Sequence, residues 1–512
     1  MAGSVTDTSP PLLELRGIDK RFGTVHANKA VHLTLRHHEV LGLLGENGAG
    51  KTTLMNILFG MYSADAGEIL IDGRPVTIRS PADALANGIG MVHQHFHLVA
   101  RHSVLENLMV GQPGRRGLVD RARAEARLAE IGRHYGLDLD PERQVGTLTV
   151  GEQQRLEIVK ALFRGARILI LDEPTSVLTP QESDGLFAAI RAMAADGVGV
   201  VFISHKLDEV RAIARRLTVL RHGEVAAVLD NDESVTNHRL ALLMCGHDLV
   251  PPEKSVREPG RALLTLDHVN TARSPGRHTA LQDVSLTVHA GEVVGVAGVS
   301  GNGQRELADV IAGTLSPASG RIAVDGQEVP TGRPRSMQRL GVASIPEDRI
   351  GAGLLTSLPL SDSMVLPRVG GPPFSRFGVL NRGAVRDFVV NQIETFGIKA
   401  GGPDVRTGTL SGGNLQKALL ARELAFDPLV LVAAQPTRGL DVAAQSFVHG
   451  QLLDLRARGR GVLVISEDLE ELFELSDRIA VMFEGRILDV VPAAEADVRR
   501  IGLLMAGARD AA

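Results

Sequence analysis

Residues 45–53 read Gly-Glu-Asn-Gly-Ala-Gly-Lys-Thr-Thr, and this glycine-rich run before a lysine and two threonines constrains the fold most strongly. The apolar residues 41–44 predict a short buried strand, and apolar residues at helical spacing follow until Gly60. A strand that enters a helix through glycines directs backbone N–H groups and a helix N-terminus at one point, which suits a triphosphate. We therefore expect a nucleotide-binding loop that uses Gly45, Asn47, Gly48, Gly50, Lys51, Thr52 and Thr53.

Two side chains of this loop have specific chemistry toward a nucleotide. Lys51 would neutralise the β- and γ-phosphates, and the Thr52 hydroxyl would help to hold Mg²⁺. An ordinary glycine turn is the alternative interpretation, but it explains neither residue.

Length, charge and cysteine content restrict the class of protein. A chain of 512 residues is too long for one hydrophobic core and predicts about two to four domains. The formal net charge of −5 provides no global basic field for nucleic acid or anionic membrane. The single cysteine, Cys245, permits no internal disulfide, and we expect it to be buried. Because the polar residues 1–11 do not fit a signal peptide and no apolar run approaches about 18 residues, we expect a cytoplasmic chain without its own membrane span.

The chain contains an internal repeat with a long period. Residues 45–53 return as 298–306, 171–175 return as 433–437, and 203–205 return as 465–467. A period of this length indicates a duplicated domain rather than a solenoid. Residues 251–262 have linker chemistry, so the predicted domains are 12–250 and 263–508.

Apolar segments alternate with turns and helical patterns in each copy, which indicates a mostly parallel sheet with helices on its faces. The expected strands lie near Leu41 and at 168–171, 200–203, 293–296, 429–432 and 462–465. Residues 120–136 predict a surface helix outside that sheet, with Asp120 as its N-cap and Asn381 as the N-cap of its counterpart.

Two acids follow the apolar segment 168–171. Asp172 and Glu173 would lie at the carboxyl edge of the sheet, beside Lys51. Asp172 suits a direct or indirect role in holding Mg²⁺, and Glu173 suits polarising the attacking water. The alternative is that both acids merely begin the next helix ahead of Pro174.

Between loop and acids, residues 148–154 read Leu-Thr-Val-Gly-Glu-Gln-Gln, and residues 410–416 read Leu-Ser-Gly-Gly-Asn-Leu-Gln. The phosphate loop, Ser-Gly-Gly signature, acidic strand end and following histidine together resemble ABC-type ATPases over roughly residues 12–490. The resemblance implies an α/β fold of two tandem P-loop NTPase domains, each a mostly parallel sheet with an inserted helical subdomain. It also implies that each nucleotide lies between one domain's phosphate loop and the other domain's signature.

The resemblance implies a complete first site. Phe22 matches the aromatic that stacks on adenine, and a core phenylalanine is the alternative. Gln94 matches the glutamine that senses Mg²⁺ and the permease, and His205 matches the switch histidine at the γ-phosphate. The implied catalytic residues are Glu173, His205 and Gln94, and the implied Mg²⁺ site is Thr52, Gln94 and Asp172. From the second copy, the site would receive Ser411, Gly412, Gly413 and Asp441.

The second site departs from the family pattern. Gln304 stands where Lys51 stands in the first copy, and Arg305 and Glu306 replace the threonines. The counterparts of Gln94, Asp172, Glu173 and His205 are Glu347, Ala434, Gln435 and Glu467. The signature of the first copy, residues 149–151, is Thr-Val-Gly. If each site pairs the phosphate loop of one domain with the signature of the other, every departure falls in the same composite site. We therefore expect that site to bind nucleotide weakly and not to turn over.

The finer resemblance is to the tandem ATPases of bacterial importers for simple sugars and nucleosides. The residues that carry it are 345–349, 353–354 and 436–442, and those that favour nucleosides are 433–436, 301–304 and 94–99. The implied function is ATP hydrolysis coupled to solute import, with ATP and Mg²⁺ as cofactors. The implied partners are permease subunits and an extracytoplasmic solute-binding protein, at the cytoplasmic face of the inner membrane. A simple sugar such as a pentose or a galactoside is the alternative solute.

Two other functional classes remain as alternatives. A soluble ribosome-associated tandem ABC protein usually has two intact loops and a long charged linker, unlike residues 251–262. A regulatory protein that binds ATP without hydrolysis would not need Asp172, Glu173 and His205. The histidines at 93, 95 and 97 also suggest a metal site, but no acidic or cysteine partner is nearby in the sequence.

Overall fold

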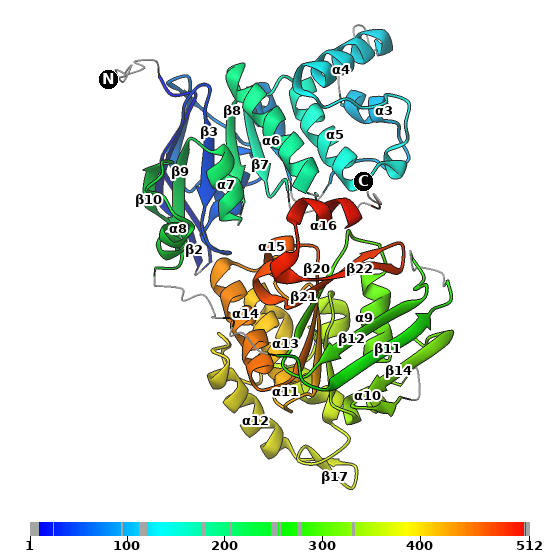
Figure 1. Cartoon of the computed structure of the whole chain (residues 1–512). Coiled ribbons are helices and arrows are strands. Elements are labelled where there is room, and N and C mark those ends of the chain that lie inside the picture. Colours follow the sequence, from blue (N-terminus) through cyan, green and yellow to red (C-terminus); the bar gives the residue numbers. More distant parts are fainter. Residues whose placement is uncertain are drawn as a thin grey trace. The chain divides into compact units, whose positions relative to one another are not determined.

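The computed structural model describes residues 10–23, 25–93, 96–111, 120–175, 178, 180–204, 206–246, 254, 258–273, 279–329, 333–505 and 507. The chain divides into two compact units, Met1–Leu249 and Val250–Ala512, and each unit is described by itself (Figure 1).

The helices and strands of the first unit are β1 (Leu13–Phe22), β2 (Val25–Leu35), β3 (Val40–Leu44), α1 (Lys51–Leu58), β4 (Ala66–Ile71), β5 (Arg74–Val76), α2 (Pro81–Ala86), β6 (Ile89–Val92), α3 (Val104–Met109), α4 (Arg121–Tyr135), α5 (Val150–Phe163), β7 (Ile168–Asp172), α6 (Pro180–Ala195), β8 (Gly199–Ile203), α7 (Leu207–Ile213), β9 (Arg216–Arg221), β10 (Glu224–Asp230) and α8 (Asn237–Cys245).

Those of the second unit are β11 (Ala262–Asn270), β12 (Val284–His289), β13 (Val293–Ala297), α9 (Gln304–Ala312), β14 (Ser319–Val324), β15 (Gln327–Glu328), α10 (Pro334–Arg339), β16 (Val342–Ile345), α11 (Leu360–Val365), β17 (Ser375–Arg376), β18 (Val379–Leu380), α12 (Arg382–Thr395), α13 (Gly412–Leu424), β19 (Val430–Ala434), α14 (Val442–Ala457), β20 (Gly461–Ser466), α15 (Leu469–Leu475), β21 (Arg478–Phe483), β22 (Arg486–Pro492) and α16 (Val498–Met505).

Both units have the same two main sheets. In the first unit, a six-stranded sheet has the order β10-β9-β3-β8-β7-β6, in which β9, β3, β8, β7 and β6 are parallel and β10 is antiparallel to β9. A four-stranded antiparallel sheet has the order β2-β1-β4-β5. The second unit repeats these orders as β22-β21-β13-β20-β19-β16 and β12-β11-β14-β15. The predicted α/β fold class and its duplication are confirmed.

The expected parallel strands are all present, as β3, β7, β8, β13, β19 and β20. They were visible in the sequence because they are buried on both faces and therefore read as continuous apolar runs. In the second unit, Val293 packs with the helical side of the sheet, whereas Val294 packs with the antiparallel sheet and α9. Helices α3, α4 and α5 pack on one another and form the inserted helical part of the first unit (Figure 1).

Cap predictions outside the sheets are also confirmed. Helix α4 begins after Asp120, whose side chain accepts from the N–H of Arg123, and it ends at Gly136. Its counterpart α12 is capped in the same way by Asn381. Cys245 is buried, as expected. Within the described residues, every helix is too short or too polar to cross a bilayer.

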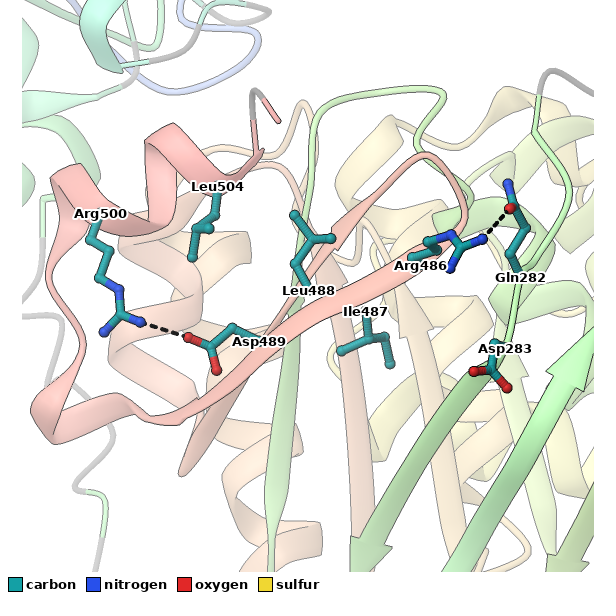
Figure 2. Close-up of a pocket in the computed structure, with 8 residues that line it drawn as sticks. All are labelled: Gln282, Asp283, Arg486, Ile487, Leu488, Asp489, Arg500 and Leu504. Carbon is teal, nitrogen blue, oxygen red and sulfur yellow. Dashed lines mark hydrogen bonds and ion pairs between the residues drawn. The ribbon is translucent and has the colours of Figure 1, made fainter. Parts of the chain in front are cut away.

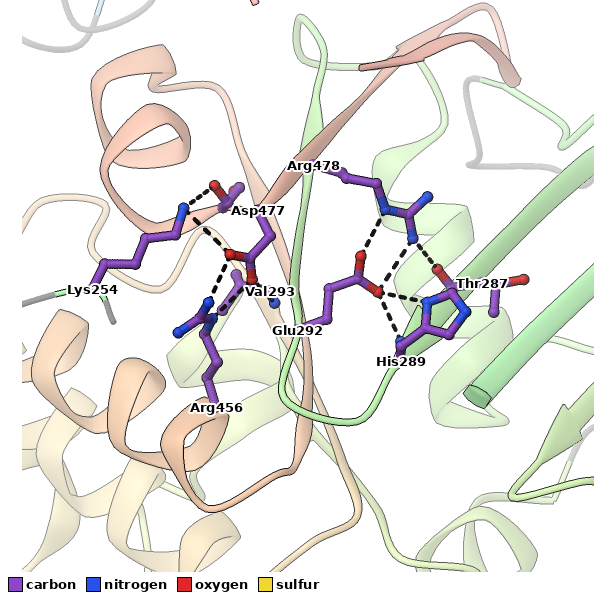
Figure 3. Close-up of polar contacts among 9 residues, drawn as sticks. Lys254, Thr287, His289, Glu292, Val293, Arg456, Asp477 and Arg478 are labelled. Carbon is purple, nitrogen blue, oxygen red and sulfur yellow. Dashed lines mark hydrogen bonds and ion pairs between the residues drawn. The ribbon is translucent and has the colours of Figure 1, made fainter. Parts of the chain in front are cut away.

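A buried ion pair joins the two sheets of each unit. In the second unit, Glu292 is 1% exposed and accepts from Nε of Arg478 at 2.6 Å, while Nη2 of Arg478 donates to the Thr287 carbonyl of β12 at 2.9 Å (Figure 3). In the first unit, Glu39 and Arg216 form the same pair at 2.9 Å. The duplication therefore extends to single buried side chains.

The neighbouring contacts of the second unit hold the segment between α15 and β21. The carboxylate of Asp477 binds Nε of Arg456 at 2.9 Å and lies 3.6 Å from Nζ of Lys254 (Figure 3). Lys254 also donates to the carbonyl of Ser476. A described residue of the predicted linker is thus bound to the second unit.

Candidate nucleotide-binding site

The phosphate loop of the first unit is held by a close approach of backbone and side chain. Gly50 has a φ of 102° and caps α1, and a Cβ placed there would lie 2.7 Å from Nδ2 of Asn28. Asn28 is fully buried and donates to the Gly50 carbonyl at 3.1 Å. Both the positive φ and the close contact require glycine at position 50.

The charges of this loop favour an anion. Lys51 Nζ donates to the carbonyls of Gly45 and Glu46 at 2.5 and 3.0 Å, so the ammonium group lies over the loop. The first turn of α1 contains Lys51, Thr52 and Thr53 and carries no acid that would neutralise the positive end of the helix. Thr52 is exposed in that turn. These features suit the phosphates of a nucleotide.

Two carboxylates lie with Lys51 in one electrostatic cluster. Burial and the charge of Glu173 raise the pKa of Asp172 to about 6, and the charge of Lys51 opposes this rise. Glu173 follows β7 with a φ of 50° and donates its N–H to the Ile203 carbonyl at 2.8 Å. A desolvated carboxyl beside a second acid would be stabilised in its ionised form by a divalent cation. Asp172 and Thr52 therefore fit a Mg²⁺ site.

Phe22 lies at the end of β1 and is 44% exposed. Its ring packs edge-on against Tyr62, with the centroids 5.3 Å apart, and Nζ of Lys20 lies 5.5 Å from its centroid. The alternative of a core phenylalanine is wrong, and a role of Phe22 in adenine stacking stays a prediction.

Gln94 and His205 lie outside the described residues. The chain just after Gln94 is tied to α5, because the N–H of His97 donates to Glu157 at 2.6 Å and Lys160 donates to the His97 carbonyl at 2.8 Å. The rings of His93 and His97 are 4.8 Å apart, and burial together with His97 lowers the pKa of His93. His95 also lies outside the described residues, and among those described no three potential ligands form a metal cluster.

The phosphate loop of the second unit keeps the backbone but lacks the lysine. Gly303 caps α9 with a φ of 108°. Gln304 is 8% exposed and donates to the Val299 carbonyl at 2.9 Å, so a neutral amide takes the place of the ammonium group of Lys51. Glu306 places a carboxylate in the first turn of α9, where it opposes the binding of a phosphate.

The strand ends of the second unit also lack the residues predicted to act in the first unit. Gln435 has a φ of 49°, like Glu173, but follows Ala434 rather than an acid. Burial raises the pKa of Glu467, which stands at the position of His205. Glu347, at the position of Gln94, accepts from Nη1 of Arg438 at 2.6 Å.

The two signatures present different groups. Ser411 precedes α13, and its hydroxyl accepts from Nδ2 of Asn414 at 2.8 Å and caps no backbone N–H of the described helix. Ser411 and Gly412 are exposed. Thr149 precedes α5, and its hydroxyl caps the N–H of Glu152, whose carboxylate accepts the Thr149 N–H in return. In the first unit, side chains of the unit itself bind backbone N–H groups at the start of the signature helix. In the second unit, no side chain caps the described start of the signature helix, and Ser411 and Gly412 are exposed.

Asp441 and the signature of the second unit share one surface. Asp441 caps α14 through the N–H of Ala444 at 2.8 Å. A Cβ placed at Gly413 would lie 3.5 Å from the Cβ of Ala444. The structure therefore brings Ser411, Gly412, Gly413 and the start of α14 together within the second unit. The roles of these residues toward a nucleotide stay predictions.

Sequence reasoning missed the residues that support these sites. Asn28 lies on a strand of the antiparallel sheet, and nothing in its own neighbourhood of the chain links it to Gly50. Glu157 and Lys160 lie in α5 and reach His97 only through the fold. A comparison of the two repeats for charged residues present in one copy only could have singled out Arg349, whose Nη1 would lie 4.0 Å from a Cβ placed at Gly412.

The second unit also has a pocket of about 470 Å³ between β22, α16 and the start of β12 (Figure 2). Its lining residues are Gln282, Asp283, Arg486, Ile487, Leu488, Asp489, Arg500 and Leu504. Arg486 donates to Gln282 at 2.8 Å and Arg500 donates to Asp489 at 2.9 Å, so each arginine is bound to another lining residue. None of the lining residues belongs to the loops, strand ends or signatures above.

Solved structures with two cassettes share the fold of the whole chain. The archaeal ribosome recycling factor aABCE1, solved in a complex with the ribosomal stalk protein aP1, aligns over 93% of this chain and 90% of its own with a TM-score of 0.62 and 20% identity. A structure described as RNase-L Inhibitor aligns over the same shares with a TM-score of 0.63 and 20% identity. At this identity the likeness is one of fold alone.

Sequence relatives cover the chain at much higher identity. The glucose import ATP-binding protein TsgD13 of Haloferax volcanii is 42% identical over 98% of this chain and 97% of its own. The nucleoside import ATP-binding protein NupA of Lactococcus lactis is 40% identical over 97% of this chain and 98% of its own. The guanosine import ATP-binding protein NupO of Bacillus subtilis is 42% identical over 97% of both chains. A family model described as ABC transporter matches residues 28–176 and 281–438, and the chain therefore belongs to the ABC transporter family, with two copies of its ATP-binding domain.

Proposed function

We propose that this chain hydrolyses ATP at one composite site and thereby energises the import of a nucleoside. The chain is the ATP-binding, ATP-hydrolysing subunit of an importer for nucleosides or simple sugars, in line with relatives 40–42% identical over nearly their whole length. The observation that carries the proposal is the cluster of Lys51, Asp172 and Glu173 in the first unit. Its counterpart in the second unit is Gln304, Ala434 and Gln435.

The working site, in this proposal, combines the phosphate loop of the first unit with the signature of the second. Ser411, Gly412 and Gly413 supply a hydroxyl and backbone N–H groups, and Asp441 lies on the same surface. The exposed start of α13 supports this pairing, because an uncapped helix N-terminus favours an anion. The degenerate loop would then meet Thr149, whose hydroxyl is already used as a cap.

Each residue of the working site has a proposed task. Lys51 and the first turn of α1 bind the β- and γ-phosphates, and Phe22 stacks on the adenine. Glu173 orients the attacking water and accepts its proton. Gln94 and His205 contact the metal and the γ-phosphate. Thr52, Gln94 and Asp172 would hold Mg²⁺, which neutralises phosphate charge when it is bound.

The proposed partners are two permease subunits, with an extracytoplasmic solute-binding protein acting through them. We place the chain at the cytoplasmic face of the membrane. The segment around α3 supports a docking role, because Val99 and Val110 flank it and are 44% and 48% exposed. Ser103 and Glu106 close a capping box on α3, which makes this short helix well defined.

Uptake of labelled solutes by the chain with its neighbouring permease tests the proposal. We expect ATP-dependent accumulation of nucleosides that is lost in a Lys51→Ala variant, whereas pentoses, galactosides and glucose accumulate little. Uptake of a sugar alone would overturn the nucleoside assignment and leave import intact. Co-sedimentation with ribosomes, without co-purification of a permease, would overturn import itself. The fold shared with the recycling factor does not favour that outcome, because it rests on 20% identity.

A further inference from the structure

An arginine of the second unit lies beside the intact signature. A Cβ placed at Gly412 would lie 4.0 Å from Nη1 of Arg349, so the guanidinium group adjoins the signature backbone. Arg349 begins the short π-helix η2 (Arg349–Gly353). The end of η2 is fixed to α13, because the buried side chain of Arg422 donates to the Gly353 carbonyl at 2.7 Å. The position of Arg349 is thus set by the same helix that carries the signature.

The acids next to Arg349 in the chain bind other groups. Asp348 accepts the N–H groups of Ile350 and Gly351 at 3.0 and 2.8 Å. Glu347 pairs with Arg438. Within the described part of the chain, no carboxylate forms an ion pair with Arg349. Burial and the nearby charge of Arg438 lower the pKa of Arg349, so its strongest charged neighbour is a second cation. A partly buried guanidinium in this environment favours an anionic ligand.

In the first unit an uncharged residue takes the place of Arg349, and a carboxylate lies beside the following position of the signature. Phe96 stands at the position of Arg349, and a Cβ placed at Gly151 would collide with Oε1 of Glu182. Ala444 stands at the position of Glu182 in the second unit. The signature with the Ser-Gly-Gly sequence therefore has a guanidinium beside it, and the Thr-Val-Gly signature has a carboxylate.

We propose that Arg349 binds the terminal phosphate of the ATP held by the phosphate loop of the first unit, together with Ser411 and Gly412. ADP lacks the terminal phosphate that the guanidinium group of Arg349 would bind. The arginine therefore favours closure on ATP over closure on ADP. This inference rests on the composite site of the proposed function. It adds a phosphate-binding residue from outside the signature.

The test compares nucleotide affinities in full-length chains that carry Glu173→Gln, so that ATP is not consumed. We expect Arg349→Gln to weaken ATP binding roughly 10- to 100-fold and to leave ADP affinity unchanged. Arg349→Lys, which keeps the charge, recovers part of the loss. The matched control is Arg386→Gln, because Arg386 is an exposed arginine of the same unit that pairs with Asp404. It should not change either affinity.

Several outcomes would overturn the role of Arg349. ATP affinity equal to that of Arg386→Gln shows that Arg349 does not touch the phosphate. Loss of both ATP and ADP affinity with a lower melting temperature indicates a structural role. In chains that keep Glu173, loss of uptake by Arg349→Gln with unchanged ATPase indicates a permease contact. Ser411→Ala separates this inference from the proposed function. If Ser411→Ala weakens ATP binding and Arg349→Gln does not, only the inference fails, and if neither does, the composite site fails.

Discussion

Glu173 and Gln435 occupy equivalent places in the two units and have the same left-handed backbone, with φ values of 50° and 49°. Each donates its N–H to the neighbouring parallel strand, Glu173 to Ile203 at 2.8 Å and Gln435 to Ile465 at 2.7 Å. This conformation costs a residue with a side chain roughly 1–2 kcal/mol. Because the second unit keeps it without a proton acceptor, the turn belongs to the architecture of the strand end. Function depends on the side chain that the turn presents.

A Glu173→Gln variant should therefore lose turnover and keep its fold. We expect the ATPase rate to fall by about 10²–10⁴-fold, because an amide can orient a water but cannot accept its proton. ATP binding and the melting temperature should change little. The matched change in the second unit, Gln435→Glu, should not raise the rate, since Gln304 and Ala434 remain. Near-normal turnover by Glu173→Gln would contradict the assignment of the base.

The raised pKa of Asp172 predicts how stability depends on pH. Because the folded chain holds this proton up to a pH of about 6 and the unfolded chain releases it near 3.8, the ionised carboxyl destabilises the nucleotide-free fold above that window. Asp172→Asn should raise the melting temperature at pH 7.5 and should not raise it at pH 4. Thermal unfolding without nucleotide or Mg²⁺ measures both. A benefit that is equal at both pH values would show that Asp172 does not titrate there.

The same carboxyl predicts how Mg²⁺ acts on the wild-type chain. A proton and the cation compete for Asp172, so the Mg²⁺ concentration needed for half-maximal ATPase should rise about tenfold per unit as pH falls below about 6. Titrations of Mg²⁺ at pH 5, 6 and 7.5 measure this change. A requirement that is independent of pH would exclude Asp172 from the metal site.

The residues that precede the two signature helices, Ser411 and Thr149, predict different effects of substitution by alanine. Ser411→Ala should lower ATPase roughly 10- to 100-fold with little loss of stability, because the serine hydroxyl does not cap the described start of α13. Thr149→Ala should leave ATPase nearly unchanged and cost about 1 kcal/mol, because it removes half of a capping box. Urea unfolding and steady-state ATPase of both variants provide the comparison. The reverse pattern would assign the working signature to the first unit.

The sequence was most informative where burial or glycine dictates the local pattern. The central strands such as β7 and β19 are apolar throughout because both faces are covered, so they could be located to within a residue or two. The duplication followed from matching motifs alone. The antiparallel sheets were missed, because a strand such as β1 mixes apolar residues with Glu, Arg, Asp and Lys and is buried on one face.

The sites could be predicted in part for a related reason. Lys51, Asp172 and Glu173 belong to motifs whose order in the chain indicates their chemistry. Asn28 contacts Gly50, and Arg349 lies near Gly412, only through the fold. Residues 345–349 carry part of the family resemblance, but no local pattern indicates either contact. The charge contrast between the two signatures became visible only when Arg349 and Glu182 were placed beside Gly412 and Gly151.

One further difference between the units involves the threonines that follow β7 and β19. In both units a threonine hydroxyl donates to a glutamate of the second helix after it, Thr175 to Glu209 of α7 at 2.5 Å and Thr437 to Glu471 of α15 at 2.7 Å. In the second unit, His449 adds its two ring nitrogens, which lie 3.2 Å from Glu471 and 3.2 Å from Glu474. The first unit has the buried Phe187 at this position. The histidine therefore connects α14 and α15 through charge in the second unit alone.

From the raised pKa of His449 we expect the free energy of unfolding to fall at high pH. Burial opposes its protonation, but the hydrogen bonds to Glu471 and Glu474 raise the pKa of His449 to about 9. Its contribution is therefore complete below about pH 6.5, the value for an unfolded histidine, and disappears as pH rises through about 9. At pH 6, His449→Gln should lower the free energy of unfolding by about 2–3 kcal/mol, and the difference should shrink toward pH 10. Urea unfolding at pH 6, 8 and 10 measures it, with the exposed His134→Gln as control. A difference that stays constant across this range would show that His449 is held neutral, and the link between α14 and α15 would then depend on packing rather than on charge.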